Sequence, residues 1–310
     1  MRFDDVVGLV GETPLVGIQS LSPKLTVRLW AKLEGQNPTG SVKDRIAKAM
    51  IEDAEDAGLL TEDKVLLEPT SGNTGISLAF FAKRKGYRIV CVMPETASTE
   101  RAQLIELFGG EIVFSPGDRG SNGAIDLARQ MAASDSKYLM LYQYGNAANP
   151  AAHEAATGPE ILKDLPNISH FVAGLGTGGT LTGVGRFLKQ TKPGVRIVAA
   201  EPQQGDLVYG LRSLDDGFIP PVFDASVLDS KIKVDAANSV TWTKALASQE
   251  GIFAGISAGA TVHAARKIAE RIDEGDIVCL FADGGWKYLS TEIWSKQIDE
   301  AAKSVEYMPW

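Results

Sequence analysis

The feature that most constrains this sequence is a repeated alternation of short apolar runs with helical patterns, which begins near residue 65. Each run is rich in β-branched residues, lacks strict polar alternation and precedes a loop that contains Gly, Ser or Pro. Such runs suit strands covered on both faces, and their alternation with helices predicts a parallel sheet built from βαβ units. The chain is therefore expected to have an α/β fold. The predicted strands are 65–68, 88–93, 111–114, 138–144, 170–175, 196–201 and 276–282.

Two helices have clear signals between these strands. Ile46, Met50, Ala54 and Ala57 recur at helical spacing before Gly58, and the segment 76–86 closes with basic residues and a glycine, as a helix C-terminus should. In contrast, residues 203–238 are weakly periodic and rich in Asp, Gly and Pro. We expect a long surface excursion there, of the kind that is more often functional than idle.

Length and composition exclude several classes of protein. A chain of 310 residues with 44% hydrophobic and 23% charged residues is compatible with one large or two smaller globular domains, but not with a disordered or coiled-coil protein. The net charge is −8 and no basic tract stands out, so nucleic acid is not expected as a partner.

Other features indicate where the protein works. No basic N-terminal region precedes a long apolar stretch, and the longest apolar run is too short to span a bilayer, so we expect a cytoplasmic protein without a membrane contact. Cys91 and Cys279 lie in apolar runs, which favours buried thiols in a reducing compartment. His153, His170 and His263 lack companions at ligand spacing, so no metal site is predicted.

One lysine stands at the predicted start of a helix. In NPTGSVKDR (37–45), Lys43 follows a turn and precedes the helical pattern. The positive end of the helix dipole opposes its charge and would lower its pKa, which suits a lysine that forms a Schiff base. Taken alone, the residue fits an exposed surface lysine better.

Three loops give this lysine a context. PTSGNTG (69–75) follows a predicted strand and opens a helix, where backbone N–H groups can hold a carboxylate; the alternative is an ordinary turn capped by Ser71 or Asn73. GLGTGGTLTG (174–183) is a glycine-rich loop suited to a phosphate, and GISAGA (255–260) opens a helix with a short hydroxyl at Ser257.

Together these segments resemble the cysteine synthase family of fold-type II pyridoxal-phosphate enzymes, whose fold is like that of the tryptophan synthase β-subunit. The resemblance runs from GETPLV (11–16) to FADGGWKYLS (281–290), and so covers nearly the whole chain. It implies two domains, each with a twisted, mainly parallel sheet flanked by helices. The smaller, mobile domain would span residues 40–147, and the larger, cofactor-binding domain would comprise 1–39 and 148–310. The family is commonly homodimeric.

The resemblance also implies site residues. Lys43 would hold pyridoxal 5′-phosphate covalently and move the Cα proton, while Asn73 would hydrogen-bond the ring hydroxyl and Ser257 would face the ring nitrogen. A neutral hydroxyl makes the ring a weaker electron sink, which favours prompt loss of a β leaving group. The cofactor phosphate would be held by Gly176, Thr177, Gly178, Gly179 and Thr180. The substrate carboxylate would be bound by Thr70, Ser71, Thr74 and Gln143.

The implied reaction is β-elimination to an aminoacrylate, followed by addition of a sulfur nucleophile to give L-cysteine. The segment 210–223 resembles the branch that uses O-phosphoserine, in which an arginine at the place of Arg212 binds the substrate phosphate; O-acetylserine is the other substrate class. Arg212 could instead pair with Asp215 or Asp216, and Arg101 and Arg119 are alternative phosphate partners. The sulfur donor is left open between sulfide and a thiocarboxylate on a small carrier protein.

Other functions have to be weighed against this one. GLGTGG satisfies the dinucleotide-binding fingerprint, and Glu201 ends the next strand near the spacing of a ribose-binding acid, which would indicate an NAD-dependent oxidoreductase. That function leaves the other three segments unexplained. Within the resembled fold, a serine or threonine dehydratase and cystathionine β-synthase remain open. The apolar C-terminal residues 307–310 are expected either to dock on the protein or to cover the mouth of the cleft.

Overall fold

The computed structural model describes residues 2–206, 208–297 and 300–302, and in this part of the chain the strands form two separate sheets. The larger sheet has six strands in the order β1-β2-β10-β7-β8-β9, and only β1 runs antiparallel to its neighbour. Its strands are β1 Leu15–Gly17, β2 Val27–Leu33, β7 Ile168–Gly174, β8 Arg196–Pro202, β9 Ser230–Val234 and β10 Gly275–Phe281. The smaller sheet has four parallel strands in the order β5-β4-β3-β6. Its strands are β3 Val65–Pro69, β4 Arg88–Pro94, β5 Glu111–Ser115 and β6 Tyr138–Met140.

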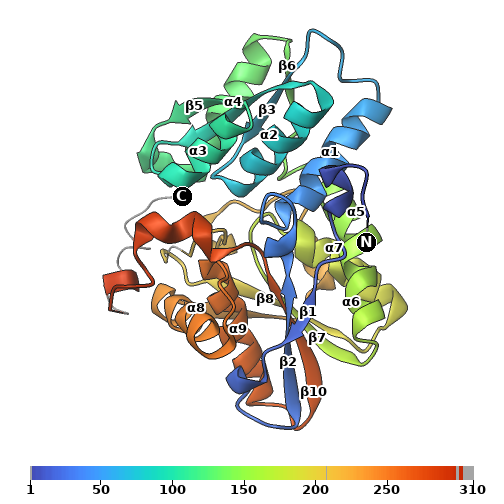
Figure 1. Cartoon of the computed structure of the whole chain (residues 1–310), viewed down its shortest axis with the longest axis vertical. Coiled ribbons are helices and arrows are strands. Elements are labelled where there is room, and N and C mark those ends of the chain that lie inside the picture. Colours follow the sequence, from blue (N-terminus) through green and yellow to red (C-terminus); the bar gives the residue numbers. More distant parts are fainter. Residues whose placement is uncertain (1, 207, 298–299, 303–310) are drawn as a thin grey trace.

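Helices cover both sheets (Figure 1), as the βαβ alternation predicts. With the smaller sheet lie α1 Lys43–Asp56, α2 Asn73–Lys85, α3 Thr99–Leu107 and α4 Gly120–Ser134. With the larger sheet lie α6 Gly158–Asp164, α7 Gly179–Thr191, α8 Ala236–Glu250 and α9 Ile256–Ala269, and α5 Ala148–Ala152 packs against both α1 and α7. A π-helical turn, η5 (His153–Thr157), joins α5 to α6, and a 3₁₀ segment, η8 (Gly285–Thr291), follows β10. The α/β architecture with two mainly parallel sheets is thus confirmed.

The predicted elements agree with the structure at most places. All seven predicted strands exist, and α2 ends at Gly86 in the left-handed conformation (φ 84°) that glycine adopts without strain. Strands β1 and β2 were not predicted, because the alternation was traced only from residue 65. Strand β6 ends at Met140 rather than at 144, because Tyr142 takes a left-handed conformation (φ 58°) that turns the chain out of the sheet.

The segment 203–238 was predicted wrongly as a surface excursion throughout. It contains strand β9 on the edge of the larger sheet, and Val208, Tyr209 and Leu211 are buried in the core. Because Asp, Gly and Pro are interspersed among them, these short apolar stretches give no clear periodicity in the sequence.

The two sheets correspond to separate stretches of the chain, since the strands of the smaller sheet all lie between residues 65 and 140. The boundaries at 40 and 147 stay a prediction. The predicted docking or lid role of 307–310 falls outside the described residues. Cys91 and Cys279 are buried free thiols, as predicted. Within the described ranges, no three His, Cys, Asp or Glu side chains are placed to hold a metal ion, and no helix is long and apolar enough to cross a membrane.

Candidate active site

A cavity of about 210 Å³ lies at the carboxyl ends of the parallel strands and is lined from both sheets. Its walls come from the loops after β3, β7 and β10, from the start of α1, and from Asp206 and residues 210–216. Ligands of parallel α/β sheets bind at this edge, because loops from several strands converge there. The position alone identifies the cavity as the candidate active site.

Lys43 is the first residue of α1 and lines the cavity. Burial lowers the pKa of Lys43 to about 8, although the carboxylates of Asp283 and Glu34 oppose this shift. The sequence argument was right about the direction, but desolvation rather than the helix dipole is the main cause. A lysine with this pKa is partly uncharged near neutral pH, as a nucleophilic or proton-transferring amine has to be.

The loop 69–75 is shaped by its own hydroxyl groups. Thr70 Oγ1 accepts hydrogen bonds from the backbone N–H groups of Gly72 (3.0 Å) and Gly75 (3.2 Å), and Thr74 Oγ1 donates to Gln143 Oε1 (2.6 Å). The N-cap of α2 is Gly72, with no side-chain cap, so the capping role considered for Ser71 or Asn73 is wrong. The predicted carboxylate binders Thr70, Ser71, Thr74 and Gln143 all line the cavity.

Only part of the glycine-rich loop faces the cavity directly. Gly176 and Thr177 line it, whereas Gly178, Gly179 and Thr180 form the turn into α7. Gly178 has φ 82°, and a Cβ on Gly179 would lie 1.9 Å from Asn149 Oδ1, so both positions require glycine. The first helical hydrogen bond runs from Thr182 N to Gly178 O, and Gly179 N donates to Thr177 Oγ1 at 3.3 Å, which leaves the amides of Gly178, Thr180 and Leu181 available for an anion.

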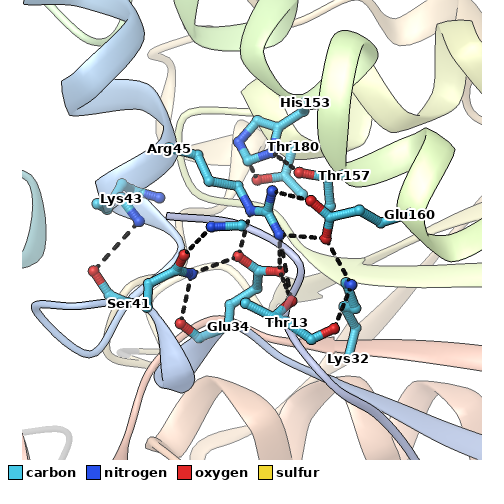
Figure 2. A network of polar contacts seen from close by, with 12 residues as sticks. Thr13, Lys32, Glu34, Ser41, Lys43, Arg45, His153, Thr157, Glu160 and Thr180 are labelled. Carbon is cyan, nitrogen blue, oxygen red and sulfur yellow. Dashed lines mark hydrogen bonds and ion pairs between the residues drawn. The ribbon is translucent and has the colours of Figure 1, made fainter. Parts of the chain in front are cut away.

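Thr180, in the first turn of α7, contacts a buried histidine. The hydroxyl of Thr180 lies 3.2 Å from His153 Nε2, and His153 Nδ1 lies 2.9 Å from Thr157 Oγ1 (Figure 2). Burial, together with the nearby Arg45 and Lys43, holds the pKa of His153 well below its usual value, so the ring is neutral. His153 is therefore a core histidine that contacts the predicted phosphate loop.

Ser257 and Asn73 lie on different walls of the same cavity. Ser257 is buried as the second residue of α9, two residues after the N-cap Gly255. Asn73, the first residue of α2, donates from Nδ2 to Asp283 Oδ2 at 2.7 Å. The structure thus brings together the lysine, the amide and the hydroxyl that the three loops supply.

Arg212 reaches the cavity from the segment after β8. Its Nη1 donates to Asn122 Oδ1 (3.2 Å), and its guanidinium lies over the rings of Phe218 and Tyr144. Among the described residues Arg212 forms no ion pair, so it pairs with neither Asp215 nor Asp216; Asp215 pairs with Lys233 instead at 2.7 Å.

The two alternative arginines also line the cavity but are already engaged. Arg119 is exposed and pairs with Asp126 at 2.6 Å. Arg101 is buried, donates from Nη1 to Ser71 O (3.2 Å), and lies over the rings of Tyr209 and Tyr288. Among the described residues neither Arg101 nor Arg212 forms an ion pair, and Arg212 is the more exposed of these two.

A buried network of charges beneath Lys43 was not predicted from the sequence. Arg45 donates to both Glu34 and Glu160, and Lys32 donates to Glu160 at 2.7 Å (Figure 2). The two cations lower the pKa of Glu160 to about 2 against the opposing effect of burial, so its carboxylate stays charged. The network fixes the first turn of α1, and hence Lys43, to β2 and α6. A charged residue within a largely apolar segment, such as Lys32 in VRLWAKL, was the sequence signal that could have indicated this buried network.

The residue expected to bind ribose in an oxidoreductase serves another purpose. Glu201 is buried at the end of β8, accepts from Leu214 N (2.7 Å) and pairs with Lys231 and Lys233. Its carboxylate anchors the following loop and the neighbouring strand, so the dinucleotide interpretation loses its acidic residue.

The donors around the cavity fit a phosphorylated aldehyde cofactor. A partly uncharged lysine can form the covalent bond, the amides before α7 can hold the phosphate, and a neutral hydroxyl at Ser257 suits an uncharged ring nitrogen. These are the residues that would hold pyridoxal phosphate.

Comparisons with known proteins agree with this chemistry. The family model "Pyridoxal-phosphate dependent enzyme" matches residues 6–283. The cysteine synthase of Staphylococcus aureus is 42% identical over 302 residues, covering 94% of this chain and 97% of the relative. The crystal structure of O-ureido-L-serine synthase superposes with a TM-score of 0.89 at 40% identity, covering 96% of this chain and 98% of that one. A hydrogen sulfide-producing enzyme from Fusobacterium nucleatum superposes with a TM-score of 0.88 at 37% identity, covering 93% and 100%. The chain therefore belongs to the pyridoxal-phosphate dependent enzymes and, within them, to the cysteine synthase family.

Proposed function

We propose that this enzyme makes L-cysteine from O-phosphoserine by β-elimination of phosphate and addition of a sulfur nucleophile. The observation that carries the choice of substrate is Arg212, a half-buried arginine in the cavity wall without an ion-pair partner among the described residues. A planar guanidinium can form two parallel hydrogen bonds to a phosphate dianion, whereas an acetyl group offers it no charge.

The remaining roles follow from the positions of the side chains. When bound, pyridoxal phosphate withdraws electrons from the α-carbon of an amino acid. Lys43 would hold the cofactor covalently and, once released, take the Cα proton, for which a pKa of about 8 is well matched. Asn73 and Ser257 would contact the ring.

The other wall of the cavity would bind the amino acid. Thr70, Ser71, Thr74 and Gln143 would hold its carboxylate, and the amides of Gly176–Thr180 would hold the cofactor phosphate. With the carboxylate fixed near β3, the β-substituent of the substrate would extend toward Arg212. O-acetylserine remains the second candidate substrate.

Arg212→Ala tests the choice of substrate. Loss of a charge-assisted contact of about 2–3 kcal/mol should lower kcat/KM for O-phosphoserine roughly 30- to 100-fold and leave that for O-acetylserine almost unchanged. Arg119→Ala is the matched control, because Arg119 lines the same cavity but already pairs with Asp126. Equal losses for both substrates in Arg212→Ala would show a purely structural arginine.

Several broader properties remain part of the proposal. We infer a homodimer, a mobile smaller domain spanning 40–147, a cytoplasmic location and no nucleic-acid partner. Sulfide or a carrier-protein thiocarboxylate would supply the sulfur. Light scattering of the purified protein tests the dimer, and turnover with sulfide alone distinguishes the two donors.

A further inference from the structure

Lys287 is a fully buried lysine for which the proposed reaction has no direct use. It lies in η8, and its Nζ donates to Asn73 Oδ1 at 2.8 Å. Lys287 itself does not line the cavity, whereas Asn73 does. The contact joins the segment after β10 to the first residue of α2, and so links the larger sheet to the helices of the smaller one.

Stability alone gives little reason for a lysine at this position. Removing an ammonium group from water is costly, and a buried apolar side chain of similar size often stabilises a protein at least as well. Asp283 and Asp44 face the ammonium and favour its charge, while Lys43 and Arg101 oppose it. Burial lowers the pKa of Lys287 to about 8, so much of it is still protonated at neutral pH.

The two ends of the Asn73 amide are held by groups of opposite character. Asp283 Oδ2 accepts from Asn73 Nδ2 at 2.7 Å, and Lys287 Nζ donates to Asn73 Oδ1. A carboxylate can only accept and an ammonium can only donate, so a single orientation of the amide satisfies both. The flipped amide would place oxygen against carboxylate and N–H against ammonium.

We propose that Lys287 is a positioning residue for the cofactor, because it locks the Asn73 amide in the orientation that leaves its second Nδ2–H for the cofactor ring. The proposal rests on the role proposed for Asn73 and deepens it. Asp283 completes the lock from the other side, and the hydroxyl of Tyr288 donates to the same Asp283 oxygen at 2.7 Å.

A double-mutant cycle with pyridoxal phosphate as the probe tests this role. Lys287→Met should weaken binding of pyridoxal phosphate to the apoprotein roughly tenfold and shift the absorption maximum of the bound form, because the amide is no longer fixed. Asn73→Ala should weaken binding at least as much. If Lys287 acts through Asn73, the double variant should match Asn73→Ala within about a factor of two.

Two further variants separate positioning from a structural role. Lys287→Gln keeps an N–H donor for Asn73 Oδ1 without the charge, and should retain affinity within about threefold. Lys189→Met removes a partly buried ammonium near the end of α7, one bonded to Asp229 and to the carbonyl of Val195, and should lower the melting temperature without shifting the absorption maximum.

The outcomes can be told apart from those of the substrate proposal. Unchanged affinity in Lys287→Met, or losses that multiply in the double variant, would overturn the role of Lys287. Unchanged affinity in Asn73→Ala would remove the role of Asn73 itself. The ratio of kcat/KM for O-phosphoserine to that for O-acetylserine should stay constant in Lys287→Met, because it reports on Arg212 and not on the amide.

Discussion

The guanidinium of Arg101 lies over the ring of Tyr288, with 4.9 Å between its central carbon and the ring centroid. Arg101 comes from α3 beside the smaller sheet, and Tyr288 comes from η8 after the last strand of the larger one. A second ring, Tyr209, lies 5.2 Å away, and Nη1 donates to the carbonyl of Ser71. Arg101 thus holds the loop 69–75 against the larger sheet.

Arg101→Leu should therefore loosen that loop. The variant loses two cation–π contacts and one charge-assisted hydrogen bond, all in a buried setting, and should reduce the free energy of unfolding by about 2–4 kcal/mol. Urea denaturation measures the change. Arg119→Leu is the matched control, since its exposed ion pair with Asp126 should contribute less than about 1 kcal/mol. Equal stability of the two variants would contradict the anchoring role of Arg101.

Lys43 should govern capture of the cofactor. Lys43→Ala should abolish both the absorbance of covalently bound cofactor and turnover, while Lys48→Ala, five residues along the same helix and paired with Glu52, should change neither. Because the amine reacts in its uncharged form and its pKa is about 8, the rate of capture should rise with pH up to about 8 and then level off. Borohydride reduction followed by peptide mapping identifies the lysine. A pyridoxyl group on another lysine would refute the assignment.

Ser257 should set the electronic character of the ring. In Ser257→Asp a carboxylate would favour a protonated ring nitrogen, strengthen the electron sink, and so slow elimination while side reactions increase. The variant should still bind pyridoxal phosphate. Stopped-flow elimination kinetics measure the effect, and rates equal to those of the wild-type protein would rule out a contact between Ser257 and the ring nitrogen.

Sequence reasoning found those parts of the site that local motifs carry. Lys43, Asn73 and Ser257 each lie in the first turn of a helix after a short loop, and the βαβ pattern is enough to bring such loops to one edge of a sheet. The cavity therefore contains nearly every residue the motifs suggested. Gly178, Gly179 and Thr180 differ because the loop turns away from the cavity as α7 begins.

The side chains behind the motifs could not be found in this way. Asp283 and Lys287 are in FADGGWKYLS, yet nothing in that segment shows that they contact Asn73, more than 200 residues earlier. The network of Arg45, Glu34 and Glu160 likewise joins α1, the segment after β2 and α6. Such contacts depend on how the two sheets pack, which local periodicity does not encode.

Glu68 shows the same kind of long-range contact at the end of β3. Its fully buried carboxyl accepts from the backbone N–H groups of Tyr142 (2.7 Å) and Gln143 (3.0 Å), where Tyr142 has φ 58°. A left-handed conformation is unfavourable for a tyrosine and persists only when its surroundings hold it. Glu68 thus fixes the turn that presents Gln143 to the cavity.

Glu68→Gln should misplace Gln143 and alter the pH dependence of stability. A glutamine has one acceptor oxygen in place of two, so one backbone N–H loses its partner, and KM for the amino-acid substrate should rise roughly five- to tenfold.

Burial raises the pKa of Glu68 from 4.5 to about 8. Between these values the folded state binds more protons than the unfolded state, so the contribution of Glu68 to stability falls as pH rises from 4.5 to 8. Urea denaturation at pH 5.5 and 7.5 should therefore show a smaller loss in Glu68→Gln than in the wild-type protein. Glu111→Gln, an exposed substitution on β5, should keep the wild-type difference. An identical pH dependence in Glu68→Gln and the wild-type protein would show that Glu68 is charged at neutral pH.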